Sequence, residues 1–206
     1  MAVIVVGGQT RNIGKTSVVA ALIAALPQLA WTAFKITQFG HGICSANGKS
    51  CDCETSTHTI AISQERDSAT GTDSARFLSA GAVRSFWVRT LQGQLAEAMP
   101  RIRKEIASAT NTIIESNSII GLLQPDLYLT VLDPANLDFK ASAQRYLDRA
   151  DAILWSGTAG SHDAMQQLAR SKPQFFLEPP SFASASLTKF VAEQVAGKST
   201  ITRLEK

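Results

Sequence analysis

The chain has 206 residues, of which 45% are hydrophobic and 18% charged, and its formal net charge is +3 at pH 7. This length and composition fit one globular α/β domain with a substantial core, and the weak charge without a basic run does not favour a nucleic-acid partner. No apolar stretch reaches the length of a membrane span, and no basic region precedes the apolar N-terminal run as in a signal peptide. We therefore expect a cytoplasmic protein that binds neither a membrane nor a nucleic acid.

The first predicted elements are a strand, a glycine-containing loop and a helix. Residues 2–6 are apolar and predict a short buried strand, and residues 17–26 predict the start of a helix. The intervening Gly-Gly-Gln-Thr-Arg-Asn-Ile-Gly-Lys-Thr-Ser segment, placed between strand and helix, is typical of a phosphate-binding loop. We call residues 8–17 the phosphate loop. Its predicted nucleotide-binding residues are Gly8, Gln9, Thr10, Arg11, Asn12, Ile13, Gly14, Lys15, Thr16 and Ser17.

The residue types of the phosphate loop match the chemistry of a triphosphate. Free backbone N–H groups and the positive end of the following helix favour an anion. Lys15 would reach the β- and γ-phosphates, and the Thr16 hydroxyl would ligate Mg²⁺. The strict pattern requires glycine at position 9, where this chain has Gln9, and its first glycine is Gly8. The alternative is a chance Gly-Lys-Thr at a helix start.

Further along the chain, strands alternate with helices. Residues 31–37 predict a second strand, and residues 38–72 a long polar insertion of the kind that is usually functional or mobile. The later predicted elements are a helix over 73–80, a strand over 83–88, a helix over 91–109 that Pro100 kinks or divides, a strand over 112–115, a short helix or turn over 118–123, a strand over 126–132, a helix over 139–149, a strand over 152–155, a helix over 163–170, a strand over 174–177 and a helix over 184–195.

This alternation predicts a doubly wound, mostly parallel sheet with helices on both faces. We expect one domain over residues 1–206, with the insertion after the second strand. The ligand should lie at the carboxyl ends of the strands.

Two carboxylates and a second lysine are predicted at those strand ends. Glu115 ends a short apolar strand, where a carboxylate holds Mg²⁺ or orients an attacking water, and the alternative is a solvent-exposed acid. Asp73 opens a helix and is a second Mg²⁺ candidate, with a plain N-cap as its competitor. Lys35, near the end of the second strand, could meet a phosphate or a carboxylate substrate, act as an amine with a lowered pKa, or be a surface lysine. The predicted catalytic residues are Lys15, Lys35 and Glu115, and the predicted Mg²⁺ ligands are Thr16, Asp73 and Glu115.

All three cysteines lie inside the insertion, in a stretch of ten residues, with two histidines nearby. Cys44, Cys51 and Cys53 with His41 or His58 form a suitable tetrahedral set for Zn²⁺ in a reducing compartment. A redox thiol cluster, iron–sulfur ligation and no special role are the alternatives.

The phosphate loop resembles that of dethiobiotin synthetase, with Gly8, Gly14, Lys15 and Thr16 in place. Lys35 falls where that family has the lysine that ends its second strand. Asp73 and Glu115 resemble two positions that hold Mg²⁺ in that family. The family's proline after this lysine is absent here.

The stretch over residues 71–82 is instead similar to the molybdopterin-guanine dinucleotide biosynthesis protein B family. Those proteins place Val-Glu-Gly after a strand, where this chain has Ile-Glu115-Ser116. Both families belong to one superclass of dimerising phosphate-loop NTPases. The resemblance therefore implies a homodimer that binds ATP or GTP with Mg²⁺.

Three functions follow from these patterns. The first is a nucleotide-binding, nucleotide-hydrolysing accessory protein with a cofactor-biosynthesis partner, similar to protein B. The second is an ATP-dependent ligase of the dethiobiotin-synthetase type with a small-molecule substrate, and the third is a non-enzymatic, nucleotide-gated metal carrier. The nucleobase is not readable, because no Asn/Thr-Lys-x-Asp guanine motif follows residues 152–155. The resemblance places the base near residues 156–161 and 178–181.

Overall fold

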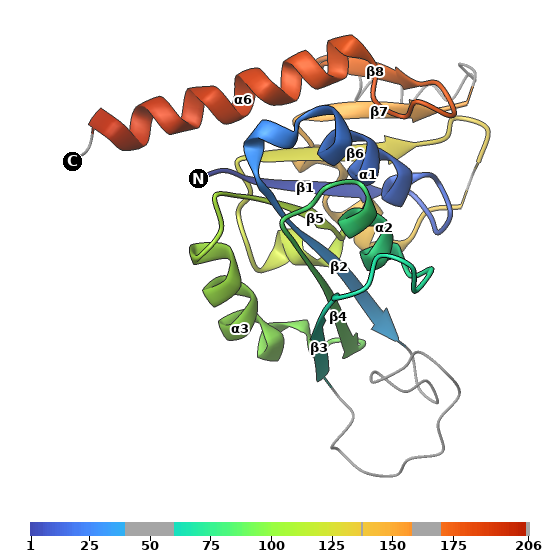
Figure 1. Ribbon diagram of the computed structural model, residues 1–206. Coiled ribbons are helices and arrows are strands. Elements are labelled where there is room, and N and C mark those ends of the chain that lie inside the picture. Colours follow the sequence, from blue (N-terminus) through green and yellow to red (C-terminus); the bar gives the residue numbers. More distant parts are fainter. Residues whose placement is uncertain (40–59, 137, 158–169, 205–206) are drawn as a thin grey trace.

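The computed structural model describes residues 1–39, 60–136, 138–157 and 170–204. It contains an eight-stranded sheet with the strand order β3-β4-β2-β5-β1-β6-β7-β8, in which β3 and β8 lie at opposite edges (Figure 1). The strands are β1 (Val3–Gly8), β2 (Trp31–Phe39), β3 (Ile60–Gln64), β4 (Arg84–Leu91), β5 (Asn111–Glu115), β6 (Leu127–Leu132), β7 (Ala152–Ser156) and β8 (Gln174–Leu177). Neighbouring strands are parallel except for β3, which is antiparallel to β4.

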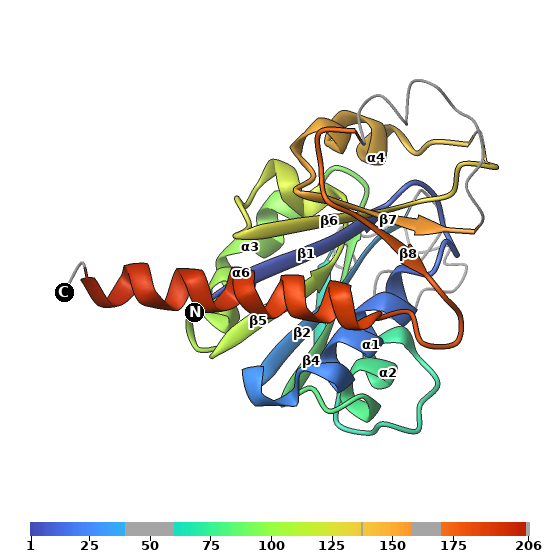
Figure 2. The same ribbon diagram turned by 90° about the horizontal axis from the view of Figure 1, so that it is seen from above.

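Helices cover both faces of this sheet. Figure 2 shows α1 (Lys15–Ala25) and α2 (Asp73–Ser79) on one side, and α3 (Leu95–Ala107) and α4 (Ala141–Arg145) on the other. The long α6 (Ala185–Leu204) packs on the α1 face. The short 3-10 helices are η1 (Pro27–Leu29), η3 (Ser118–Gly121) and η4 (Leu147–Arg149). None of the helices in the described ranges has both the length and the apolar character needed to cross a bilayer.

The alternating side chains of β1 explain why two layers of helices are needed. Ile4 and Val6 join the core cluster beneath α1 and α6, whereas Val3 and Val5 join the cluster beneath α3. All four side chains are buried, because a strand in the middle of a parallel sheet is covered on both faces. The continuous apolar run at residues 2–6 is the sequence signal of this position.

The structure confirms the doubly wound sheet and most of the predicted elements, but it corrects the insertion over residues 38–72. The second strand runs on to Phe39, and β3 forms within the predicted insertion. Ile60 and Ile62 of β3 pack against the α3-side cluster, and this packing supports an edge strand in a polar segment.

The predicted helix over residues 139–149 is also wrong in length. The chain forms α4 and then η4, separated at Tyr146, whose φ of −117° and ψ of 12° are not helical. Pro100 does not divide the helix around it, since α3 runs unbroken from Leu95 to Ala107. Pro100 is the sixth residue of α3 and lacks the N–H that a helix pairs with the carbonyl four residues earlier, yet the helix continues past it. The predicted helix over residues 163–170 lies almost wholly outside the described residues.

We predict that Gly7→Ala destabilises the fold by roughly 1–3 kcal/mol, the usual cost of overpacking. A Cβ at Gly7 would stand 2.7 Å from the Tyr128 hydroxyl and even closer to Asn117 Oδ1; two hydrogen bonds to Gly8 hold Asn117, and the Tyr128 side chain is buried. The free energy of unfolding from urea titration measures this loss. As a matched control, Gly197→Ala in α6 meets no atom within 4 Å and should leave the stability unchanged or raise it by up to ~1 kcal/mol.

Candidate functional site

The candidate site lies where β1, β2 and β5 end and α1 begins. The three strands are parallel neighbours, so their carboxyl ends share one edge of the sheet. The phosphate loop connects β1 to α1, whose N-cap is Gly14. Gly14 has a φ of 97°, in the left-handed region that a side chain disfavours, and this conformation turns the loop into the helix.

Gln9 explains why the strict glycine is dispensable. Its side chain is fully buried, where the amide nitrogen donates to the Asn136 carbonyl at 2.6 Å and the amide oxygen accepts from the Asp133 N–H at 2.8 Å. The Gln9 side chain therefore ties the phosphate loop to the segment that follows β6. A glycine could make neither bond.

Asn117 holds the neighbouring residue of the loop. Its Oδ1 accepts from the Gly8 N–H at 2.7 Å, and its Nδ2 donates to the Gly8 carbonyl at 2.8 Å. Both backbone groups of Gly8 are thus fixed by one side chain from beyond β5. Sequence reasoning missed Asn117, although its place two residues after Glu115 was an available signal.

Thr16, Lys35, Asp73 and Glu115 meet at this edge, and we call them the Lys35 cluster. Thr16 Oγ1 donates to Glu115 Oε2 at 2.8 Å. Lys35 Nζ lies 2.5 Å from Glu115 Oε1, 2.7 Å from Asp73 Oδ2 and 3.2 Å from Thr16 Oγ1. Lys35, which is predicted as catalytic, therefore contacts all three of the residues predicted as Mg²⁺ ligands.

The alternatives for these residues were a solvent-exposed acid at Glu115, a surface lysine at Lys35 and a plain N-cap at Asp73. The Glu115 side chain is 4% exposed and that of Lys35 is 17% exposed, so neither is a solvated surface group. Asp73 is not the N-cap of α2, because Thr72 caps it by accepting from the Ala75 N–H. Asp73 instead lies in the first turn of α2, where it pairs with Lys35.

Several cations surround the phosphate loop. The pKa of Lys15 is lowered to about 8, mainly by burial and in smaller part by Lys140 and Lys35, whereas Glu115 and Asp73 oppose the shift. Burial, with Arg11 and Lys35, also lowers the pKa of Lys140, whose backbone N–H donates to the Gln9 carbonyl. Positive groups that repel one another in a small volume suit a polyphosphate anion. Sequence reasoning did not find Lys140.

The oxygens of the Lys35 cluster fit Mg²⁺, which prefers one or two carboxylates together with a hydroxyl and phosphate oxygens. The described residues hold no group of three or more His, Cys, Asp or Glu side chains arranged for a metal ion. His41, Cys44, Cys51, Cys53 and His58 lie outside the described residues, so the zinc site stays a prediction.

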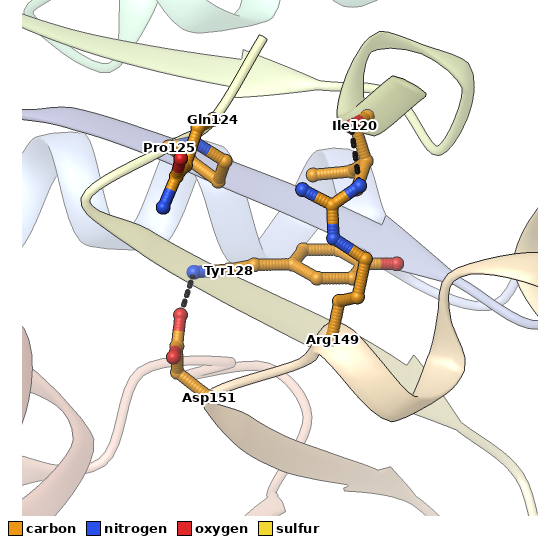
Figure 3. A pocket seen from close by; sticks show the side chains of 6 residues that line it. All are labelled: Ile120, Gln124, Pro125, Tyr128, Arg149 and Asp151. Carbon is orange, nitrogen blue, oxygen red and sulfur yellow. Dashed lines mark hydrogen bonds between the residues drawn. The ribbon is translucent and has the colours of Figure 1, made fainter. Parts of the chain in front are cut away.

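A separate cavity of about 260 Å³ lies between η3, η4 and the start of β6 (Figure 3). Its two charged side chains already have partners, since Arg149 Nη1 donates to the Ile120 carbonyl at 2.9 Å and Asp151 Oδ2 accepts from the Tyr128 N–H at 2.6 Å. Burial raises the pKa of Tyr128 to about 12. The cavity contains none of the predicted site residues, so the phosphate loop remains the stronger candidate.

Neither a protein-family model nor a curated protein matches this sequence. The structure is similar to that of HypB from Helicobacter pylori, solved in complex with nickel, with 15% identity over 95% of this chain and 87% of that one and a TM-score of 0.53. "Apo" form LpxK from Aquifex aeolicus in complex with ATP gives 16% identity over 85% and 53% of the two chains and a TM-score of 0.49. MobB from Bacillus subtilis gives 14% identity over 94% and 98% and a TM-score of 0.44.

The similarity to HypB shows the fold alone, and the fold is a mostly parallel eight-stranded α/β sheet of the phosphate-loop type. The chain therefore has the α/β fold of phosphate-loop NTPases, as the sequence predicts. At this level of identity the family within the fold is not assigned.

We predict that restoring the standard glycine with Gln9→Gly destabilises the chain by about 2–4 kcal/mol, because it removes two buried hydrogen bonds and leaves a cavity. Urea titration measures the change. Gln9→Met, which keeps most of the volume, should lose less than Gln9→Gly. If Gln9→Gly is as stable as the unaltered chain or more stable, the hydrogen bonds of Gln9 to Asp133 and Asn136 contribute nothing to the stability of the fold.

Proposed function

We propose that this chain binds a nucleoside triphosphate with Mg²⁺ at the phosphate loop and hydrolyses it. The observation that carries this proposal is the convergence of Thr16, Asp73 and Glu115 on one point next to Lys15 at the start of α1. The fold of phosphate-loop NTPases supports it, because these parts recur in such proteins at the same edge of the sheet.

Each group has a role in this function. The free N–H groups at the start of α1 bind phosphate oxygens, and Lys15 exchanges its bond to the Thr10 carbonyl for the β- and γ-phosphates. Thr16, Asp73 and Glu115 supply the oxygens for Mg²⁺, which neutralises the phosphate charge when bound. Arg11 and Lys140 add positive charge beside the loop.

The turn after β8 is our proposed neighbour of the nucleobase. The Glu178 carbonyl accepts from the N–H groups of Ser181 and Phe182, and the Phe182 ring lies against Gly14. This contact brings the turn that follows the edge strand β8 next to the phosphate loop. The choice between ATP and GTP is not part of the proposal.

Hydrolysis in an accessory role is favoured over a ligase that uses Lys35 to bind a small carboxylated substrate. The Lys35 ammonium pairs with both Asp73 and Glu115, and once Mg²⁺ takes these carboxylates the adjacent triphosphate is the anion that can replace them. The cytoplasmic homodimer, the single domain over residues 1–206 and the metal-carrying insertion remain predictions.

We predict that Lys15→Ala weakens nucleotide binding roughly ten- to hundredfold, because one charge-assisted phosphate contact contributes about 1.5–3 kcal/mol. Calorimetry with a non-hydrolysable triphosphate and Mg²⁺ measures the dissociation constant. Lys189→Ala removes the same charge from the surface of α6, far from the loop in sequence, and should bind like the unaltered chain. Equal affinity of Lys15→Ala and the unaltered chain would rule out the proposed role of Lys15.

A further prediction concerns the two carboxylates. Glu115→Gln and Asp73→Asn keep the shape of each side chain but remove its charge, so hydrolysis should fall about tenfold or more while nucleotide binding falls less. Phosphate release and calorimetry on the same preparations separate the two effects. Unchanged hydrolysis in both variants would show that neither carboxylate supports the reaction.

A further inference from the structure

Lys35 Nζ contacts the same oxygens that the proposed function assigns to Mg²⁺. Its three nearest oxygens belong to Thr16 on α1, Asp73 on α2 and Glu115 on β5, at 3.2, 2.7 and 2.5 Å. An ammonium group has three N–H donors and no acceptor, so its donor number matches this set. A cation is therefore already coordinated by the oxygens assigned to Mg²⁺.

We infer that the Lys35 ammonium and a divalent cation compete for the same oxygens, so that Lys35 acts as a built-in counter-ion that must be displaced before Mg²⁺ binds. This inference rests on the proposed function, because it concerns how the same site admits its metal. Mg²⁺ binds oxygens at about 2.1 Å, and an ammonium 2.5–3.2 Å from the same atoms cannot remain beside it.

The backbone fixes the place of Lys35. Lys35 is the register partner of Glu115 on β5 and of Trp87 on β4, so neighbouring strands hold it on both sides. Its side chain is the flexible part, since four methylene groups allow the ammonium to swing away. Displacement therefore requires a change of rotamer and no change in the sheet.

Charge explains how the competition is decided. Glu115 and Asp73 carry two negative charges, which Lys35 compensates by half, with Arg76 Nη1 3.9 Å from Asp73. A divalent cation alone would compensate them but would leave the ammonium without a partner next to a positive ion. A triphosphate supplies that partner, so Lys35 makes metal binding dependent on the nucleotide.

The test measures Mn²⁺ binding to the full chain without nucleotide, using the electron paramagnetic resonance signal of free Mn²⁺. Lys35→Met keeps most of the length of the side chain and removes the competing charge. We expect it to bind one Mn²⁺ about tenfold or more tightly than the unaltered chain, the effect of one charge-assisted contact. Lys189→Met on α6 is the matched control and should bind like the unaltered chain. Equal Mn²⁺ affinity of Lys35→Met and the unaltered chain would overturn the inference.

A stability measurement covers the case in which Lys35→Met folds poorly, since it leaves Glu115 buried without its counter-ion. The melting temperature of Lys35→Met should be lowered in chelator and rise saturably with millimolar Mg²⁺, whereas that of the unaltered chain should barely respond. A Lys35→Met chain that is destabilised and gains nothing from Mg²⁺ would contradict the exchange of one cation for the other.

Adding Asp73→Asn to Lys35→Met should abolish most of the gained Mn²⁺ affinity, because one of the two carboxylates is then neutral. If the double variant binds Mn²⁺ as tightly as Lys35→Met, the metal is bound elsewhere and the inference fails. These measurements contain no nucleotide, so they decide the role of Lys35 even if the calorimetry with Lys15→Ala refutes the proposed function.

Discussion

The register between β2 and β5 is the constraint on which the candidate site depends. It places Lys35 opposite Glu115 on adjacent parallel strands, so the two side chains leave the sheet on the same face and at the same height. The neighbouring pairing of Val6 with Glu115 brings the end of β1 to the same level, and α1 then delivers Thr16. A slip of one residue between β2 and β5 would send Lys35 to the opposite face from Glu115.

The phosphate loop depends on a second kind of support, namely side-chain hydrogen bonds that link it to distant parts of the chain. Gln9 and Asn117 bind backbone groups, and each satisfies both a donor and an acceptor. Such bonds give the loop a fixed shape before any ligand contact is made, which lowers the entropy lost on binding. At position 9 the chain therefore has a buried side chain with two hydrogen bonds, where the standard pattern has a flexible glycine.

The sequence carried enough signal for the sheet and for half of the site. Apolar runs that end in Glu115 or approach Lys35 are local patterns, and parallel pairing then brings their ends together. The partners of Gln9 and Asn117 could not be found in the same way, because they lie more than 100 residues away and depend on how loops close. The break at Tyr146 and the strand at Ile60–Gln64 were missed because packing against the core decided them over local propensity.

The phosphate loop and β1 are held by segments that the ribosome makes much later, and this order of synthesis affects how the chain folds. Both hydrogen-bonded neighbours of β1 are strands made more than 100 residues later, and Gln9 is held by residues that follow β6. At roughly 5–20 residues per second, a ribosome needs about 5 to 25 seconds to supply them. During that interval β1 has no native strand partner, and its face opposite α1, with Val3 and Val5, is open to chaperones or to other nascent chains. The segment that carries the chemistry is thus synthesised early and completed late.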